Sequence, residues 1–471
     1  MKRSTGMLGC FLLCVLCAAA VAQETRIVPV TDHVSLINDG QGGETRALVR
    51  SGKGMVVFDS FWAKAPAKRY RDAVEQVTGR NDFMYVLNMT DRLDMFGGNA
   101  AYPEARVIGH ETFRERYKGQ EEDVKTEIGR LIERWRGKEE VSRERLPTHA
   151  EGSEAAVNEE RWANTCKQRA DELKSGYSLR LPDISYSDRM TLYLGDITME
   201  LIWFGRAGNY NGMSVAVIPE EKTAFIPGFI LHSQHLAPHP FDEYKKLDID
   251  RWIAVLGEIL EGDNAVSTVI CGMGEVWNAE RAAEHLHYIR TLWKRVQELE
   301  AAGKSLAAIQ DQLSLEREFA FVKRMQAYVE GGDDWIRPQH RAHVSTFYQQ
   351  LKAYIAADML MQGGLDTLPA SLEQIRSLWS NDEDIYFDEA AIARIGDYLL
   401  KQKAVPEAIA VLTLNAEVFP ESAAVYAGLG EAYSKKGDRK QAADQYRKAL
   451  ELAPDNTAYS EKLTALEASE K

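Results

Sequence analysis

Cysteine is scarce in this sequence, and most of it lies at the very start of the chain. Of the five cysteines among 471 residues, Cys10, Cys14 and Cys17 fall in the first segment. Cys166 and Cys271 lie beyond it, in unlike local contexts. A framework of several disulfides is therefore excluded as the basis of the fold. We expect both later cysteines to be unpaired thiols.

Basic residues are also fewer than acidic residues. The chain has 57 Lys and Arg against 71 Asp and Glu, which gives a formal net charge of -14. Nucleic acids and anionic membranes attract basic surfaces, so neither is expected as the main partner. Beyond the first 22 residues, no apolar run is long enough to cross a bilayer. The hydrophobic share of 45% and the charged share of 27% are typical of a soluble globular protein.

The first 22 residues have the parts of a secretory signal peptide. Lys2 and Arg3 give a positive start, and the apolar run Met7–Ala20 is too short to span a bilayer. Small residues follow at Ala20–Ala22, where a signal peptidase would cut. We expect a mature protein that starts near Gln23 and is periplasmic or secreted. The alternative is an uncleaved anchor.

Short apolar runs separated by polar or Gly-rich breaks fill much of the chain up to residue 270, and they predict strands joined by tight turns. Helices are expected over Ala65–Val77 and Ile249–Leu260. The expected strands are Arg26–Val30, His33–Ile37, Thr45–Val49, Met55–Phe58, Phe83–Leu87, Val107–Gly109, Met190–Leu194, Thr198–Trp203, Met213–Ile218, Thr223–Ile226 and Ser267–Ile270. This order of elements predicts an α/β layered domain.

A charged segment at about residues 111–180 interrupts the strands. Its part Glu121–Arg145 is dense in Glu, Lys and Arg and carries one apolar stripe at helical spacing. The stripe consists of Ile128, Leu131, Ile132 and Trp135. We interpret the segment as a helical insertion. Two long amphipathic helices, about Ala279–Ala302 and Ser305–Glu330, are expected after the last strand.

The end of the chain repeats itself at a period of 34 residues. The unit 423–456 has its repeated residues at Tyr426, Leu429, Gly430, Tyr433, Ala442, Tyr446, Ala449 and Pro454. The unit 389–422 places Ile392, Ile395, Gly396, Leu399, Ala408, Leu412 and Pro420 in register. The pattern resembles the tetratricopeptide repeat, in which small residues let the two helices of a unit approach closely. Asn415 departs from it, because the repeat prefers Ala there. A capping helix is expected from Thr457.

The run Leu87–Asn99 ends in Gly97, Gly98 and Asn99 and begins its motif at Asn88. It resembles the signature loop of the metallo-β-lactamase superfamily, written N-T-H-x-H-x-D-H-x-G-G-N. Asp94 stands where the family has its Asp. The three positions of the family's histidines are occupied by Thr90, Arg92 and Met95.

Three later segments resemble the family in frame but differ at the ligand positions. The segment Leu201–Met213 has Asn209 near the position of the next His. Gly228 follows Phe225–Pro227 where the family has a bridging Asp, and Met273 stands where the last His belongs. Of the ligand positions that the resemblance implies, only Asp94 keeps the family's residue.

These substitutions remove the donors that zinc prefers, which are imidazole, thiolate and carboxylate. A Thr hydroxyl and a Met thioether bind Zn²⁺ poorly. Arg92 carries a fixed positive charge that repels a cation, because a guanidinium does not deprotonate in a protein. One hypothesis is that Arg92 pairs with Asp94 and stands in for the missing metal charge. We expect no metal and no other cofactor at these positions.

Histidines close after Gly228 offer a replacement site. His232, His235 and His239, with Asp242 nearby, could hold a relocated metal together with Asp94, or they could be a polar loop without a ligand. His110 occupies a position that is often His in the family but does not ligate its metal. We therefore interpret His110 as a structural residue. Cys271 is a candidate nucleophile, but we interpret it as a small buried side chain that packs in the core.

We therefore expect an α/β chain: a metallo-β-lactamase-like αββα sandwich with a helical insertion, followed by an all-α tetratricopeptide tail. The expected boundaries are a signal peptide over 1–22, the sandwich over 23–290 and the insertion at about 111–180. A helical extension over 291–384 leads to the tail over 385–471, with repeats at 389–422 and 423–456 and a capping helix.

A metallo-β-lactamase-like scaffold that lacks the usual metal ligands predicts a pseudoenzyme. Such a protein would bind a partner or ligand and would not catalyse hydrolysis. Stacked helix pairs form a groove for peptides or partner helices, so the tail is expected to bind a protein partner, to self-associate or to dock on the sandwich. One alternative is a hydrolase with zinc at the divergent site. The family's usual substrates are esters, thioesters, lactams and phosphodiesters. Another alternative is a small-ligand binder, in whose cleft Arg92 holds an anion.

Overall fold

The computed structural model describes most of the chain in nine stretches. They are residues 26–38, 46–207, 210–227, 247–271, 275–322, 332–352, 354–361, 365–381 and 385–468. The expected signal peptide over 1–22 lies outside the described residues, as do Asn209, Gly228, His232, His235, His239, Asp242 and Met273. No helix within the described stretches is long and apolar enough to cross a membrane.

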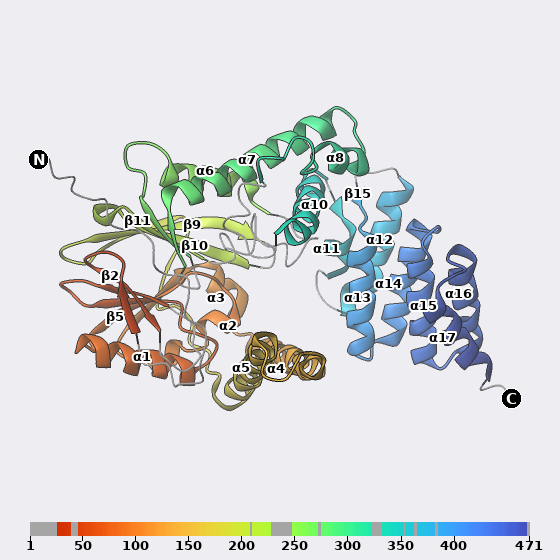
Figure 1. Cartoon of the computed structure of the whole chain (residues 1–471), viewed down its shortest axis with the longest axis horizontal. Coiled ribbons are helices and arrows are strands. Elements are labelled where there is room, and N and C mark those ends of the chain that lie inside the picture. The colour runs from red at the N-terminus through yellow and green to blue at the C-terminus, as the bar shows by residue number, and fades with distance from the viewer. Residues whose placement is uncertain are drawn as a thin grey trace, which may run out of the picture.

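Two sheets form the centre of the first domain (Figure 1). The first sheet has seven strands in the order β1 to β7, antiparallel from β1 to β4 and parallel from β4 to β7. Its strands are β1 Arg26–Pro29, β2 Val34–Asn38, β3 Arg46–Arg50, β4 Met55–Phe58, β5 Phe83–Asn88, β6 Arg106–His110 and β7 Ile184–Tyr186. Six of these strands match expected runs, and β7 is an addition.

The second sheet has six strands in the order β13-β12-β11-β10-β9-β8. All neighbouring pairs are antiparallel except β11 and β12. The strands are β8 Arg189–Tyr193, β9 Thr198–Ala207, β10 Tyr210–Ile218, β11 Thr223–Ile226, β12 Thr268–Cys271 and β13 Val276–Asn278. The strand β13 was not expected, because its three residues carry too little pattern.

Successive side chains of a strand point to opposite faces of the sheet, so each sheet has a separate hydrophobic core on either face. In β4, Val56 and Phe58 face the second sheet, while Met55 and Val57 face the helices outside. The ring of Phe58 stacks on that of Phe225, with centroids 4.0 Å apart, so the sheets pack face to face. Helix α1 (Lys64–Thr78) covers the outer face of the first sheet, and α6 (Ile249–Leu260) and α7 (Ala279–Ala301) cover the second. The expected αββα sandwich is confirmed.

The insertion is a hairpin of two long helices, α4 (Glu121–Arg145) and α5 (Glu154–Gly176), that pack along each other. Three residues of the expected stripe, Ile128, Leu131 and Trp135, are buried, and they share the outer core of the first sheet with Cys166 of α5. The first domain also contains five short helical elements. They are α2 Leu93–Phe96, η1 Asn99–Ala101, α3 Thr112–Tyr117, η2 Leu146–Thr148 and η3 Pro219–Glu221.

The helix expected over Ser305–Glu330 was wrong in its extent. Helix α8 spans Leu306–Gln312, and turns follow it up to Phe321, while residues 323–330 of the expected helix lie outside the described residues. Leu313, Leu315 and Phe319 lie in those turns and are at most 1% exposed, within the core beside the second sheet. Leu315 and Phe319 would share one helix face, but Leu313 would point to the opposite side, and the turns let the chain bury all three.

Helix α10 (Gly332–Gln350) packs on α7 and α8 and ends the sandwich's outer layer. The two-residue strand β14 (Tyr354–Ile355) then pairs in parallel with β15 (Ile385–Tyr386). Between them lie α11 Ala356–Met361, η4 Leu365–Thr367 and α12 Leu368–Ser380. Helices α11 and α12 share one core with the first repeat, so they form a further helix pair stacked on the tail.

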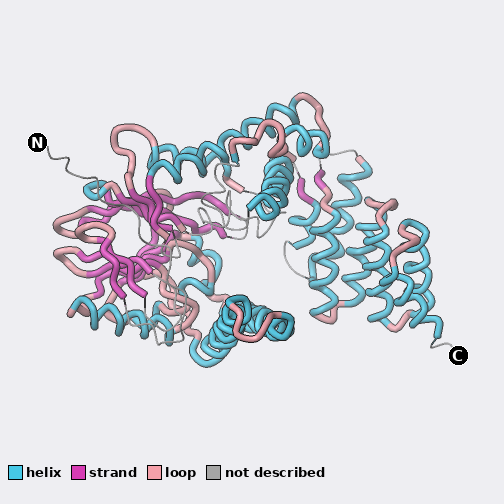
Figure 2. Tube along the Cα trace, in the orientation of Figure 1, coloured by secondary structure: helices cyan, strands magenta, loops and turns pink. Residues whose placement is uncertain are grey.

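From Glu389 to Ala468, the regular secondary structure of the tail is helical (Figure 2). Its helices are α13 Glu389–Lys401, α14 Val405–Val418, α15 Ala423–Lys436, α16 Arg439–Leu452 and α17 Thr457–Ala468, the last being the expected cap. A Cβ atom on Gly396 would lie 2.5 Å from Leu412, and one on Gly430 would lie 2.8 Å from Tyr446. These contacts explain the small residues of the repeat. The fully buried Asn415 donates to the carbonyl of Glu389 at 3.0 Å, which gives its departure from the repeat a packing role.

Candidate functional site

The two asparagines of the signature loop clamp its ends together. Asn88, the last residue of β5, and Asn99 exchange side-chain amide hydrogen bonds of 3.0 and 2.8 Å, and both are at most 1% exposed. The hydroxyl of Ser60 donates to Asn99 Oδ1 at 2.6 Å. Because each bond is fully desolvated, losing one would leave a buried amide group unpaired. These hydrogen bonds hold the two ends of the loop together.

The two glycines of the loop are required by close approach of backbone. A Cβ atom on Gly97 would lie 2.2 Å from the carbonyl oxygen of Trp62, and one on Gly98 would lie 1.8 Å from that of Ser60. These carbonyls belong to the turn after β4, where Asp59 has φ +51°. In the same turn Phe61 has φ +67°, which is unfavourable for a bulky residue, so the surrounding contacts must hold this turn in place.

Asp59 is a buried residue that the sequence reasoning missed. It is 7% exposed, and its Oδ1 accepts a hydrogen bond of 2.9 Å from the backbone N–H of Met89. The carboxylate therefore ties the turn after β4 to the start of the signature loop. A sequence signal did exist, since an acidic residue directly after a fully apolar strand needs a buried partner.

Thr90 stands at the first position where the family has a histidine. Its side chain is fully buried, and its hydroxyl has no hydrogen-bond partner in the part of the chain that the structure describes. A buried hydroxyl without a partner is unfavourable, because it has lost its bonds to water. Thr90 therefore neither replaces the imidazole as a donor to a metal nor gains a structural bond.

Arg92 and Asp94 form a two-bond ion pair in the middle of the loop. Arg92 Nε lies 2.9 Å from Asp94 Oδ1, and Arg92 Nη2 lies 2.6 Å from Asp94 Oδ2. Each side chain is only 13% exposed. Arg92 precedes α2 in extended backbone, and Asp94 lies in its first turn, so the short helix holds the pair two residues apart. Both oxygens of the one retained carboxylate are thereby occupied by a guanidinium.

The insertion contributes further charges beside this pair. Arg116 Nη1 lies 3.4 Å from Asp91 Oδ2, and Arg116 Nη2 lies 3.8 Å from Glu127 on α4. Burial raises the pKa of Glu127, the nearby Arg116 lowers it, and Asp94 raises it again. We call Asp91, Arg92, Asp94, Arg116 and Glu127 the loop–insertion cluster. It lies where α4 packs on α2, so the helical insertion covers this side of the loop.

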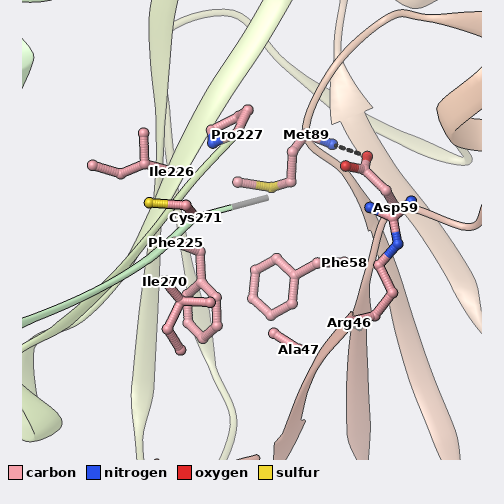
Figure 3. Close-up of a pocket in the computed structure, with 10 residues that line it drawn as sticks. All are labelled: Arg46, Ala47, Phe58, Asp59, Met89, Phe225, Ile226, Pro227, Ile270 and Cys271. Carbon is pink, nitrogen blue, oxygen red and sulfur yellow. Dashed lines mark hydrogen bonds between the residues drawn. The ribbon is translucent and has the colours of Figure 1, made fainter. Parts of the chain in front are cut away.

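A small cavity lies between the two sheets near the signature loop (Figure 3). It measures about 30 Å³, which is room for roughly one water molecule. Among the described residues, its wall comes from Arg46, Ala47, Phe58, Asp59, Met89, Phe225, Ile226, Pro227, Ile270 and Cys271. Arg92 and Asp94 are not in this wall. Figure 3 shows Met89 between Asp59 on one sheet and Cys271 on the other.

Arg46 is a second buried cation that the sequence reasoning missed. It is 3% exposed, its guanidinium lies 4.8 Å from the ring centre of Phe61, and its Nη2 lies 3.9 Å from the sulfur of Met95. Figure 3 shows its side chain extending toward Asp59. Arg46 is the first residue of β3 and directly precedes the apolar residues Ala47–Val49. Its fixed charge makes this end of the cavity unfavourable for a cation.

The described residues around the loop do not fit a zinc ion. Thr90 offers a neutral hydroxyl, Met95 a thioether, and Asp94 a carboxylate already bonded to Arg92. Burial raises the pKa of the Cys271 thiol, which favours the protonated form rather than the thiolate that binds metals. Throughout the described part of the chain, no three or more His, Cys, Asp or Glu residues are arranged to hold a metal.

His110 has the surroundings of a structural residue. It is 3% exposed, its Nε2 lies 2.6 Å from the carbonyl oxygen of Ser187, and its Nδ1 lies 3.1 Å from the hydroxyl of Thr112. Its ring stacks on that of Trp203 with centroids 5.2 Å apart. Both ring nitrogens are engaged, so His110 joins β6 to the second sheet.

Residues 423–456 match the Tetratricopeptide repeat family. The tail carries a tetratricopeptide repeat. Among curated proteins, none matches the chain in sequence.

Solved structures that resemble the chain include sulfatases and metallo-β-lactamases. A double mutant of the sec-alkyl sulfatase PisA1 has a TM-score of 0.48 and 13% identity over 91% of this chain. The inverting sec-alkylsulfatase Pisa1 from Pseudomonas sp. has a TM-score of 0.44 and 12% identity over 88%. A metallo-β-lactamase from Pontibacter korlensis has a TM-score of 0.35 and 14% identity; the match covers 57% of this chain and 99% of the enzyme. The chain spans only 65% and 62% of the two sulfatase structures. Likenesses this distant carry no argument about the site.

Proposed function

We propose that this chain is a binding protein on a metallo-β-lactamase-like scaffold, without metal-dependent hydrolysis. The observation that carries the proposal is the two-bond pair of Arg92 with Asp94, both 13% exposed. The guanidinium engages the only carboxylate that remains of the expected ligand set. Its charge fills the electrostatic role of a bound cation, because it offsets the cost of burying that carboxylate.

The chemistry of the fold supports the same conclusion. Hydrolysis here would need a metal that lowers the pKa of a bound water, or another strong base. The hydrolase alternative requires Asp94 as a ligand beside His232, His235 and His239, yet a guanidinium cannot give up a proton to release it. The alternative in which Arg92 holds an anion is also disfavoured, since Asp94 already neutralises its charge.

The tail supports binding of a protein partner. Stable repeat arrays usually need three or more units. Helices α11 and α12 stack on the first repeat, so the tail has three consecutive helix pairs before its cap. An array of this size has less need to dock on the sandwich for stability, although Arg130 of α4 lies 5.6 Å from the ring centre of Tyr398 on α13. We also propose export to the periplasm, on the signal-like residues 1–22 alone.

Turnover of chromogenic substrates tests the proposal. We would assay a sulfate ester, a β-lactam, a carboxylic ester and a phosphodiester with added zinc or manganese, using the wild-type protein and Asp94→Ala. We expect both proteins to match the buffer background. Turnover by the wild type that is lost in Asp94→Ala would instead support the hydrolase alternative.

A further inference from the structure

A second, larger pocket lies far along the chain from the signature loop, between the sandwich and the tail. It measures about 300 Å³, which is the lower end of the range for small-molecule sites. Within the described residues, its wall comes from Gln310 on α8, from Pro338, Arg341, Ala342, Ser345, Thr346 and Gln349 on α10, and from Asp388 before α13.

Two residues of this wall carry buried polar groups without a partner. Thr346 is 3% exposed and Gln349 is 2% exposed. Among the described residues, the hydroxyl of Thr346 and the Nε2 of Gln349 have no hydrogen-bond partner. Their neighbours are satisfied: Gln310 Nε2 donates to Ser345 Oγ at 2.8 Å, and Ser345 donates to the carbonyl of Arg341 at 3.2 Å. Unsatisfied buried donors of this kind are rare in folded proteins and need an explanation.

Two opposite charges complete the pocket. Arg341 contributes a guanidinium, and Asp388 contributes a carboxylate whose Oδ1 accepts from the N–H of Ala391 at 2.6 Å to cap α13. Neither residue forms an ion pair with any described part of the chain. A single pocket therefore presents an unpaired cation, an unpaired anion and two orphaned donor groups.

We propose that this pocket binds a small zwitterion, the chemistry shared by a free α-amino acid and a short peptide. The carboxylate of the ligand accepts hydrogen bonds from Arg341, from Gln349 Nε2 and from the Thr346 hydroxyl. Its ammonium group lies against Asp388. A ligand with only negative charges is repelled by Asp388, and one with only positive charges is repelled by Arg341.

The position of the pocket gives the ligand a further effect. Helix α10 belongs to the core beside the second sheet, and α13 belongs to the core of the tail. A zwitterion held by Arg341 on one side and by Asp388 on the other joins these two cores. Binding therefore stabilises the folded chain as a whole. This proposal does not depend on the chemistry of the signature loop.

Thermal unfolding of the full chain tests the proposal directly. We would add glycine, L-alanine, L-glutamate or dialanine, with acetate and methylammonium as single-charge probes. The zwitterions are expected to raise the melting temperature by about 2 °C or more, while the two probes leave it unchanged. A shift with amino acids alone assigns a free amino acid, and a larger shift with dialanine assigns a peptide. The absence of any shift, or equal shifts with acetate alone, overturns the proposal.

Variants of the charged residues separate binding from stability. Arg341→Ala and Asp388→Asn should weaken binding, measured by calorimetry, at least about tenfold. Asn is as good a helix cap as Asp, so Asp388→Asn keeps α13 intact. The matched control is Arg337→Ala, which removes the same charge one turn earlier on α10, where Arg337 pairs with Glu316 outside the pocket. Equal loss of binding in Arg337→Ala would contradict the assignment.

Variants of Thr346 and Gln349 distinguish a role in ligand binding from a role in stability. Thr346→Val and Gln349→Leu remove unsatisfied polar atoms but keep most of the side-chain volume. We expect each ligand-free variant to be as stable as the wild type or more so, and to lose the ligand-induced shift. A variant that is less stable without ligand and still binds the zwitterion normally would contradict the proposal.

Discussion

The carboxylate of Asp94 accepts hydrogen bonds from Arg92 Nε at 2.9 Å and from Arg92 Nη2 at 2.6 Å, and this pair lies where the insertion helix α4 packs over the signature loop. Asp94 is therefore part of the packing between the loop and the insertion. In the expectation from sequence, these two residues stand at ligand positions of the metallo-β-lactamase pattern, and the proposed loss of metal-dependent hydrolysis rests on their pairing.

Removing one member of this pair should be costly. Arg92→Ala leaves the carboxylate of Asp94 buried without its cation, and we expect a loss of about 3 kcal/mol in the free energy of unfolding. The double variant Arg92→Met with Asp94→Asn removes both charges and should lose much less. Urea unfolding measures both values. A single variant within about 0.5 kcal/mol of the wild type would refute a stabilising role for the pair.

Thr90 should tolerate loss of its hydroxyl, because that group has no hydrogen-bond partner. We expect Thr90→Val to leave the free energy of unfolding unchanged or to raise it by about 1 kcal/mol. Ser60→Ala is the matched control, since the buried Ser60 hydroxyl donates to Asn99 at 2.6 Å. Chemical denaturation should show a loss of about 1 to 2 kcal/mol for the control. Greater destabilisation by Thr90→Val than by Ser60→Ala would contradict this interpretation.

Gly98 should not accept any side chain. A Cβ atom there would lie 1.8 Å from the carbonyl oxygen of Ser60, so Gly98→Ala must displace the turn after β4, at a cost of about 3 kcal/mol or more. Gly129→Ala on α4 is the opposite case, because nothing lies within 4 Å of its Cβ position. It should stabilise the protein by about 0.5 to 1 kcal/mol through its helix propensity. Comparable melting temperatures for the two variants would contradict the close approach.

Acid should destabilise the protein through His340. Burial lowers the pKa of His340 from 6.5 to about 4. Its Nε2 lies 2.6 Å from the carbonyl oxygen of Leu313, and its Nδ1 lies 2.9 Å from the hydroxyl of Tyr288. The unfolded chain takes up the proton first, so this contribution to stability is complete above about pH 6.5 and is lost as the pH falls toward 4. The loss is on the order of 3 kcal/mol.

Unfolding free energies measured at intervals between pH 7 and pH 4 test this expectation. The variant His340→Gln removes the titrating group, so its stability should fall less steeply over the same interval. Identical pH profiles for the wild type and for His340→Gln would show that His340 does not contribute.

The strands could be predicted where an apolar run ends at a clear turn. The expected ranges Met55–Phe58 and Thr223–Ile226 agree with β4 and β11 to the residue. The helix over Ser305–Glu330 failed for a physical reason. Amphipathic periodicity does not show that Leu313 and Phe319 are buried by turns, because that depends on the neighbouring helices α7 and α10.

The positions of the signature-loop residues could be predicted from the sequence, but the contacts of their side chains could not. Asn88, Asp94 and Gly98 were singled out by the resemblance to the signature loop, and the structure gives each a defined contact. Asp59 was missed because its bond to Met89 joins residues 30 positions apart and depends on a positive φ. The acidic residue after an apolar strand indicates a buried partner, but no local pattern identifies that partner as Met89. The polar pocket beside Arg341 was missed for the same reason, since its wall comes from three separate helical regions.

The metal content of the purified protein tests the central claim most directly. The full chain would be prepared without chelators and without an affinity histidine tag, and zinc, iron, copper and manganese would be measured by mass spectrometry. We predict less than about 0.1 metal ion per chain, because the guanidinium of Arg92 holds the retained carboxylate. About one metal ion per chain, lost in Asp94→Ala, would contradict the claim and support a metal-dependent hydrolase.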